Sequence, residues 1–380
     1  MKYLSLIANA VARFAMRETV LLISLVAAIS SAAFVPPDRG YLDYLDWKVL
    51  SSLFCLMAVV AGFRKQGVFE IVGLSLIRLT GSLRALALAL VFATFAASMF
   101  VTNDVALITF VPFSLALLGP VASASSRATI IVLQTIAANV GSSLTPVGNP
   151  QNLYLFSFYE MSPIDFFCAI GPIVAAGAVF LALALLAVPA RVGLTAPSTG
   201  YAGKPNRRLV AVLTALFVMS VLAVFRVVDW RIALAAVVVF LALFARDLFA
   251  RVDYSLLLTF VAFFVFIGNL QRIDSVRSLL TGLVAKDVVL VGVLASQVIS
   301  NVPAAILLSP FTTDAAGLLV GVSVGGMGTI IASLASVISF KFFARECPGE
   351  TRRYLGIFTA WNLAFLVVLY AVHLVVRALG

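Results

Sequence analysis

Two short stretches of this chain share one pattern: residues 102–113 read TNDVALITFVPF, and residues 300–311 read SNVPAAILLSPF. When the two stretches are aligned without a gap, both begin with a hydroxyl residue. Identical residues then fall at five positions: Asn103 and Asn301, Ala106 and Ala304, Ile108 and Ile306, Pro112 and Pro310, and Phe113 and Phe311. Each stretch puts a polar tripeptide inside apolar sequence, which is costly in lipid unless the polar groups line a protected cavity. Two such interruptions at matching places indicate a secondary transporter built from a repeat.

The composition agrees with a chain that lies mostly in lipid. Of its 380 residues 63% are hydrophobic and 11% charged, against about 25% charged in soluble domains, and the mean hydropathy is +1.13. About nine to eleven apolar helical stretches can be marked, which predicts an all-α polytopic membrane protein. The net charge of +10 comes from basic residues scattered singly at the ends of apolar segments. No nucleic-acid partner is therefore expected.

The pattern divides the chain into two repeats joined by a polar linker. Residues 1–18 are amphipathic and are expected to form an interfacial helix that the mature protein keeps. The first repeat is predicted over residues 19–190 and the second over 209–380, with a cytoplasmic linker at 191–208. The re-entrant hairpins are expected near 83–118 and 288–312, and the broken transmembrane helices near 127–159 and 315–343.

Each predicted broken helix contains residues that interrupt helical hydrogen bonding. The first contains TPVGNPQN at 145–152, whose prolines cannot continue the ladder, and the second contains GGMGT at 325–329. We expect residues 145–149 and 325–329 to be non-helical linkers facing the hairpin tips, because freed backbone groups must be satisfied inside the protein.

The placement of lysine and arginine predicts the orientation. With the N-terminus in the cytoplasm, most of the 26 basic residues fall on the cytoplasmic side, as the positive-inside rule requires. The same assignment makes one hairpin enter from inside and the other from outside, so the repeats are predicted to be inverted. We therefore expect an integral membrane protein, in the inner membrane of a bacterium.

The predicted site lies where tips and linkers meet. Helices that begin there present N–H groups suited to an anion, and helices that end there present carbonyls suited to Na⁺. The expected substrate- and ion-binding residues are Thr102, Asn103, Asp104, Thr145, Pro146, Gly148, Asn149, Ser300, Asn301, Gly328 and Thr329. Within this set Asn103, Asp104 and Gly148 are the candidates for a Na⁺ site; no cofactor is expected other than Na⁺ as a coupling ion. The single histidine and three dispersed cysteines suggest no other metal site.

Asp104 is the one carboxylate well inside either motif, and Val302 stands at its place in the second copy. As a functional group it would bind Na⁺ or accept a proton. As a structural group it would only cap the second hairpin arm. Function is favoured, because asparagine or serine would cap without burying a charge.

At these residues the chain resembles the ion transporter superfamily, and within it the small anion-permease group of the arsenite-permease/sodium–proton-antiporter branch, related to the divalent anion:sodium symporters. The segments FVTNDVALITFVPF, LTPVGNPQNL and SNVPAAILL carry the resemblance. It implies a scaffold domain, a transport domain that moves as an elevator, and a homodimer. The chain departs from the symporters' Ser-Asn-Thr tips at Asp104 and at Val302-Pro303, and it has Met327 and Ala332 where the first break has Ser143 and Gly148.

The predicted function is secondary active transport of a small inorganic or organic anion, a carboxylate or an oxyanion, coupled to Na⁺ or H⁺. A Na⁺/H⁺ antiporter and an arsenite-type efflux permease are the alternatives. An enzyme is not expected, because the sequence lacks HExxH, paired histidines and GxSxG. A purely structural membrane subunit would not need matched polar interruptions.

Overall fold

The computed structural model describes residues 18–69, 71, 81–119, 121–190 and 205–379, and every regular element among them is helical. The predicted helix at 1–18, apart from Glu18, and residues 191–204 of the predicted linker lie outside the described residues. The α-helices are α2 (Thr19–Ala32), α3 (Trp47–Lys65), α5 (Leu83–Ser98), α6 (Asn103–Leu118), α7 (Ala124–Ser142), α8 (Pro150–Phe158), α9 (Pro163–Ala184), α10 (Arg207–Val224), α11 (Trp230–Phe244), α12 (Tyr254–Gln271), α13 (Asp274–Val284), α14 (Val288–Ile299), α15 (Asn301–Leu308), α16 (Ala315–Gly325), α17 (Leu334–Glu346) and α18 (Thr351–Leu379).

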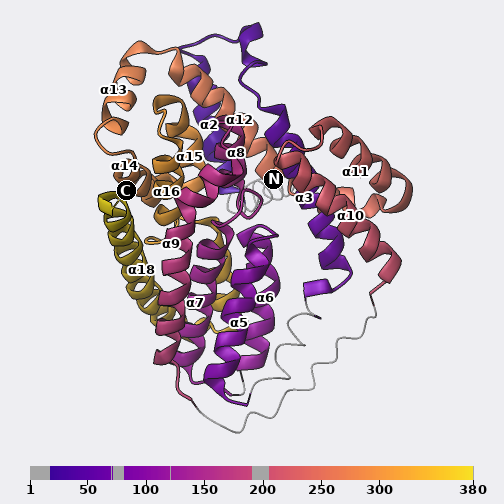
Figure 1. The fold of residues 1–380 in the computed structure, drawn as a ribbon, viewed down its shortest axis with the longest axis vertical. Coiled ribbons are helices and arrows are strands. Elements are labelled where there is room, and N and C mark those ends of the chain that lie inside the picture. The colour runs from indigo at the N-terminus through magenta and orange to yellow at the C-terminus, as the bar shows by residue number, and fades with distance from the viewer. Residues whose placement is uncertain (1–17, 70, 72–80, 120, 191–204, 380) are drawn as a thin grey trace, which may run out of the picture.

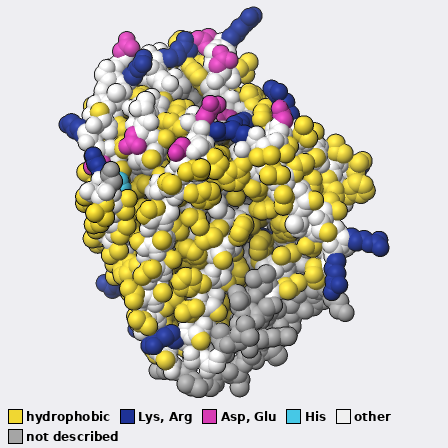
Figure 2. All heavy atoms as spheres, viewed as in Figure 1, with side chains coloured by type: hydrophobic (Ala, Val, Ile, Leu, Met, Phe, Trp, Pro, Cys, Tyr) yellow, Lys and Arg dark blue, Asp and Glu magenta, His cyan; other side chains and the backbone are white. Residues whose placement is uncertain are grey.

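The helices are apolar enough for a polytopic membrane protein, as predicted. In the described part of the chain five helices could cross a membrane by length and composition, or six spans if α13 and α14, bent by 115°, count as one. Six further apolar helices are shorter, among them both arms of the first predicted hairpin, α5 and α6. On the face shown in Figure 2, hydrophobic side chains cover most of the middle and the charged ones gather toward the top and the edges.

Two packing regions are visible in Figure 1. Helices α3, α10 and α11 pack together around a small apolar cluster that includes Cys55, Leu213 and Val237. Helices α5, α6, α7, α9 and α18 lie on the other side of the ribbon and belong to the larger core, together with α14 to α17. Helix α12 packs mainly on α2.

The two predicted hairpins pack against the two predicted broken helices in the same manner. In the first half α5 contacts α7, and a Cβ added to Gly141 would lie 2.6 Å from Ser98 Oγ. In the second half α14 contacts α16, and a Cβ added to Gly325 would lie 2.7 Å from Ser296 Oγ. Ser98 and Ser296 stand at the same distance before Asn103 and Asn301. The absence of a side chain at each glycine lets the helices approach closely.

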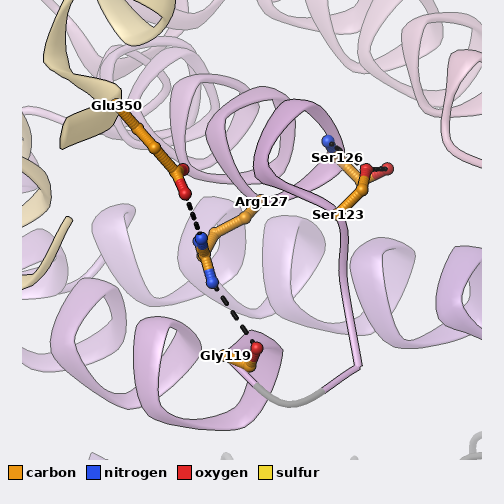
Figure 3. A network of polar contacts seen from close by, with 5 residues as sticks. All are labelled: Gly119, Ser123, Ser126, Arg127 and Glu350. Atoms are coloured by element: carbon orange, nitrogen blue, oxygen red, sulfur yellow. Dashed lines mark hydrogen bonds and ion pairs between the residues drawn. The ribbon is translucent and has the colours of Figure 1, made fainter.

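An ion pair joins the two halves at the start of α7 (Figure 3). Arg127 Nη2 lies 2.5 Å from Glu350 Oε1, and Arg127 Nη1 donates to the carbonyl of Gly119 at 3.5 Å. Ser123 caps α7 by accepting from the N–H of Ser126 at 3.2 Å. The loop after α6, the first turn of α7 and the short helical turn before α18 are thereby held together.

Candidate functional site

The first motif forms the turn between α5 and α6. The N–H of Asn103, the first residue of α6, donates to the carbonyl of Gly148 at 3.2 Å. Gly148 lies in the first break, the non-helical stretch between α7 and α8. The side-chain oxygen of Asn103 accepts from the N–H of Asp104 at 2.9 Å. Thr102 precedes the helix without a side-chain capping bond. The backbone of Asn103 therefore joins the turn to the first break, while its side chain binds the N–H of the residue that follows it.

The second motif forms the turn between α14 and α15 in the same register. The N–H of Asn301 donates to the carbonyl of Ala332 at 2.9 Å, and Ser300 Oγ lies 3.4 Å from the same oxygen. Ser300 has a φ of +73°, in the left-handed region that non-glycine residues seldom occupy. Such strain persists only where the surrounding structure holds it. Here the two contacts with Ala332 hold the turn against the second break, the non-helical stretch between α16 and α17.

A threonine in each break contacts the hairpin four residues before the asparagine. Thr145 Oγ1 donates to the carbonyl of Met99, and Thr329 Oγ1 donates to that of Gln297 at 3.0 Å. Met99 and Gln297 occupy equivalent positions before Asn103 and Asn301. The two halves thus repeat two hydrogen bonds at one spacing, because Gly148 and Ala332 each follow their threonine by three residues.

The breaks differ in length from each other. Helix α7 ends at Ser142 and α8 begins at Pro150, so the first break covers the predicted residues 145–149. In the second, Gly325 is the last residue of α16 and α17 begins at Leu334, so the predicted non-helical residues are confirmed except for Gly325, and the break continues beyond Thr329. The chain stays non-helical to Ser333, where the carbonyl of Ala332 accepts from Asn301.

Gly328 and Pro146 support the two breaks. Gly328 has a φ of +112°, and a Cβ there would lie 2.2 Å from Gln297 Oε1, so only glycine fits. Pro146 is buried in the first break. Among the described residues, Thr145, Gly148 and Thr329 likewise hold the linkers against the hairpins. None of these five residues lines the cavity of about 240 Å³ at which the two turns meet.

The remaining predicted residues meet at a cavity of about 240 Å³. Both turns and the first break contribute to it, through Asn103, Asp104, Asn149, Ser300 and Asn301. Thr102 lines a neighbouring cavity of about 640 Å³ that shares Asp104 and Asn149 with the first and extends to Arg64 and Arg251. The sequence motifs therefore come together around one site, although they lie about half a chain apart.

In the part of the chain that the structure describes, six helices begin at the wall of this cavity, here called the central cavity. Residues at the N-terminal ends of α2, α6, α8, α12, α15 and α17 all line it. The positive ends of helix dipoles are thus directed at one volume. Three carboxylates stand among them, those of Glu18, Asp104 and Asp253, together with the ammonium group of Lys341.

Asp104 has an incompletely satisfied carboxylate. Its Oδ1 is buried and has no hydrogen-bond partner among the described residues. Asp253, by contrast, caps α12 by accepting from the N–H of Leu256 at 3.0 Å. A buried carboxylate oxygen without a donor is costly, and a cation or a proton would satisfy it.

Asn139 is a central residue that the sequence analysis missed. Its side-chain oxygen accepts from Asn103 Nδ2 at 3.0 Å and from Ser333 Oγ at 2.9 Å, and its amide nitrogen donates to the carbonyl of Gly326 at 3.3 Å. It lies on α7 and is 2% exposed. The signal was an amide in the last turn of an apolar helix, which is costly in lipid unless it has partners.

Apolar helices, two of them broken, that enclose a cavity with carboxylate, amide and ammonium groups in its wall define an integral membrane protein of the transporter class. The chain belongs to the citrate transporter family: the family model CitMHS, described as "Citrate transporter", matches residues 4–339.

Three relatives illustrate the range of the matches. The inner membrane protein YbiR of Escherichia coli is 32% identical over 330 residues, which cover 83% of this chain and 86% of that protein. The uncharacterized transporter MJ0456 of Methanocaldococcus jannaschii is 30% identical over 342 residues, 86% and 89% of the two chains. The silicon efflux transporter LSI3 of Oryza sativa subsp. japonica is 31% identical over 156 residues, 40% of this chain and 32% of that protein. The family and these relatives carry the names of transporters or membrane proteins, not of enzymes.

Proposed function

We propose that the protein is a secondary active transporter of a small anion, a carboxylate or an oxyanion, coupled to Na⁺ or H⁺. The observation that supports it best is the cavity at which both turns meet and six helices begin. Backbone N–H groups and dipoles at helix N-termini attract anions without needing a buried arginine. The family description names citrate and one relative is named for silicon, so both belong among the compounds to be tested.

The carboxylates at the cavity give a physical reason for coupling. An ionised Asp104 beside Glu18 and Asp253 repels an anion. A cation bound at Asp104 removes this repulsion, so the anion binds well only when the cation is present. We propose that Na⁺ would be held by Asp104, the side-chain oxygen of Asn103 and the carbonyl of Gly148, or that a proton would occupy Asp104 alone. The unpartnered Oδ1 of Asp104 supports this assignment.

We further propose inverted repeats and an elevator movement. The paired hydrogen bonds of Asn103 with Gly148 and of Asn301 with Ala332 support a duplicated plan. In this proposal α3, α10 and α11, with α2 and α12, form the scaffold, and the helices of the larger core that carry the turns and breaks move as the transport domain. The separate apolar cluster of α3, α10 and α11 supports the division.

Flux into proteoliposomes tests the function. Citrate, other carboxylates, silicic acid and arsenite are offered in turn, with and without Na⁺ and pH gradients. Uptake of one anion that increases with one gradient is the expected result. Protein-free liposomes are the control. Exchange of Na⁺ for H⁺ that needs no anion would establish the antiporter instead, and no flux of any kind would contradict both.

We also propose that the protein is a homodimer in the bacterial inner membrane with its N-terminus in the cytoplasm. The resemblance to dimeric families supports the dimer, and the basic residues and the inner membrane relative support the location. The mass of the particle in lipid nanodiscs should correspond to two chains. A particle of one chain, in nanodiscs as well as in detergent, would contradict the dimer.

A further inference from the structure

The carbonyls at the ends of the two broken helices are the groups that would offer a cation a backbone site. A helix leaves its last carbonyls without intrahelical partners. Helices α7 and α16 end next to residues that line the central cavity: Asn149 Nδ2 lies 3.4 Å from Ser142 Oγ, and a Cβ added to Gly326 would lie 2.9 Å from Asn301 Nδ2. In the first half the carbonyls of Ser142, Ser143 and Thr145 lie 3.1–3.2 Å from Asn152 Nδ2. One amide nitrogen, from the first turn of α8, therefore covers the end of α7.

In the second half amides from two other elements cover the corresponding carbonyls. Gln297 Nε2, from α14, lies 2.8 Å from the carbonyl of Gly325 and 3.0 Å from that of Met327. Asn139 Nδ2, from α7, donates to the carbonyl between them, that of Gly326, at 3.3 Å. The oxygen of Gln297 is also used, because it accepts from the N–H of Thr329 at 2.8 Å. Both the nitrogen and the oxygen of the Gln297 side-chain amide are thus hydrogen-bonded.

The second half also lacks the other groups that make the first half suitable for a cation. The position of Asp104 is taken by Val302, which has no side-chain oxygen. The carbonyl of Ala332, which corresponds to that of Gly148, lies within hydrogen-bond distance of two donors, the N–H of Asn301 and Ser300 Oγ. A Na⁺ site at the second break therefore does not fit the residues present.

We infer that the amides of Gln297 and Asn139 occupy the place of a second coupling cation, so that this chain binds no more than one Na⁺ or proton, at Asp104. An amide NH₂ carries partial positive charge and satisfies carbonyl oxygens as a small cation does, but it is part of the protein and cannot leave during a transport cycle. The inference rests on the proposed function and adds the number of coupling ions and the residues that set it.

The test is equilibrium binding of radioactive Na⁺ to the purified full-length protein in detergent, with choline replacing Na⁺ at constant ionic strength. The wild type should bind no more than one Na⁺ per chain, and Asp104→Asn should bind none. Gln297→Glu should bind one more Na⁺ than the wild type, because it replaces a donor with a carboxylate among the carbonyls of Gly325 and Met327. Gln271→Glu, the same change at an exposed position at the end of α12, should not.

Two Na⁺ per chain in the wild type, or one retained in Asp104→Asn, would overturn the inference. Gln297→Glu that folds and binds no additional Na⁺ would also overturn it, since the amide would then not be what excludes the cation. If Gln297→Glu fails to fold, the count for the wild type still tests the number of sites, because two Na⁺ per chain would contradict the inference. Binding is measured without transport, so a failure of the proposed function would appear separately, as absent flux in proteoliposomes.

Discussion

Replacing Asp104 with asparagine is expected to abolish the dependence of anion uptake on the coupling cation. Asparagine keeps the size of the side chain and removes the charge, so the protein should fold. The cation then has only neutral ligands, and the anion no longer meets the carboxylate that repels it. A difference of about 1.4 kcal/mol already changes affinity tenfold, and removal of the one charged ligand should exceed this.

The measurement is ion-dependent uptake by equal amounts of well-folded protein in proteoliposomes. Asp165→Asn is the matched control, because Asp165 is an exposed carboxylate near the start of α9, away from the cavity. It should respond to Na⁺ and pH as the wild type does. If Asp104→Asn also responds like the wild type, Asp104 is only part of the helix terminus and the coupling group lies elsewhere.

Replacing Asn139 with leucine is expected to destabilise the protein strongly and to abolish transport. Leucine is close to asparagine in shape but offers no hydrogen bond. The amide of Asn103, the hydroxyl of Ser333 and the carbonyl of Gly326 would each lose a buried partner. An unsatisfied buried polar group costs roughly 1–3 kcal/mol, and three of them meet at the candidate site.

Thermal unfolding in detergent and uptake in proteoliposomes measure the two effects. The control is Asn362→Leu on α18, a buried asparagine whose amide nitrogen bonds only to Phe358 of its own helix, at 3.0 Å, and whose oxygen has no partner among the described residues. Asn362→Leu should unfold near the wild-type temperature. Equal loss in both variants would mean that Asn139 acts only as one more buried amide, without a special part in the site.

The sequence predicted the elements that carry the site because matched motifs encode local structure. Asn103 and Asn301 begin helices, and proline and glycine interrupt two others, for reasons that act within a few residues. Which helices then become neighbours depends on packing across the two halves. The contacts of Asn139 and Gln297 join residues from different elements, and no local pattern distinguishes an amide that will bridge two breaks from one that bonds to its own helix, as Asn362 does.

The hydrogen bonds from side-chain amides to the last carbonyls of α7 and α16 also bear on how the two halves have evolved. A helix end in the first half is covered from within, by Asn152 of the same half. An end in the second half depends partly on Asn139, which belongs to the first. A chain made of two copies of the second half would lack that amide. The halves have therefore lost their interchangeability, because a substitution of Asn139 in the first half leaves a carbonyl of the second half without this partner.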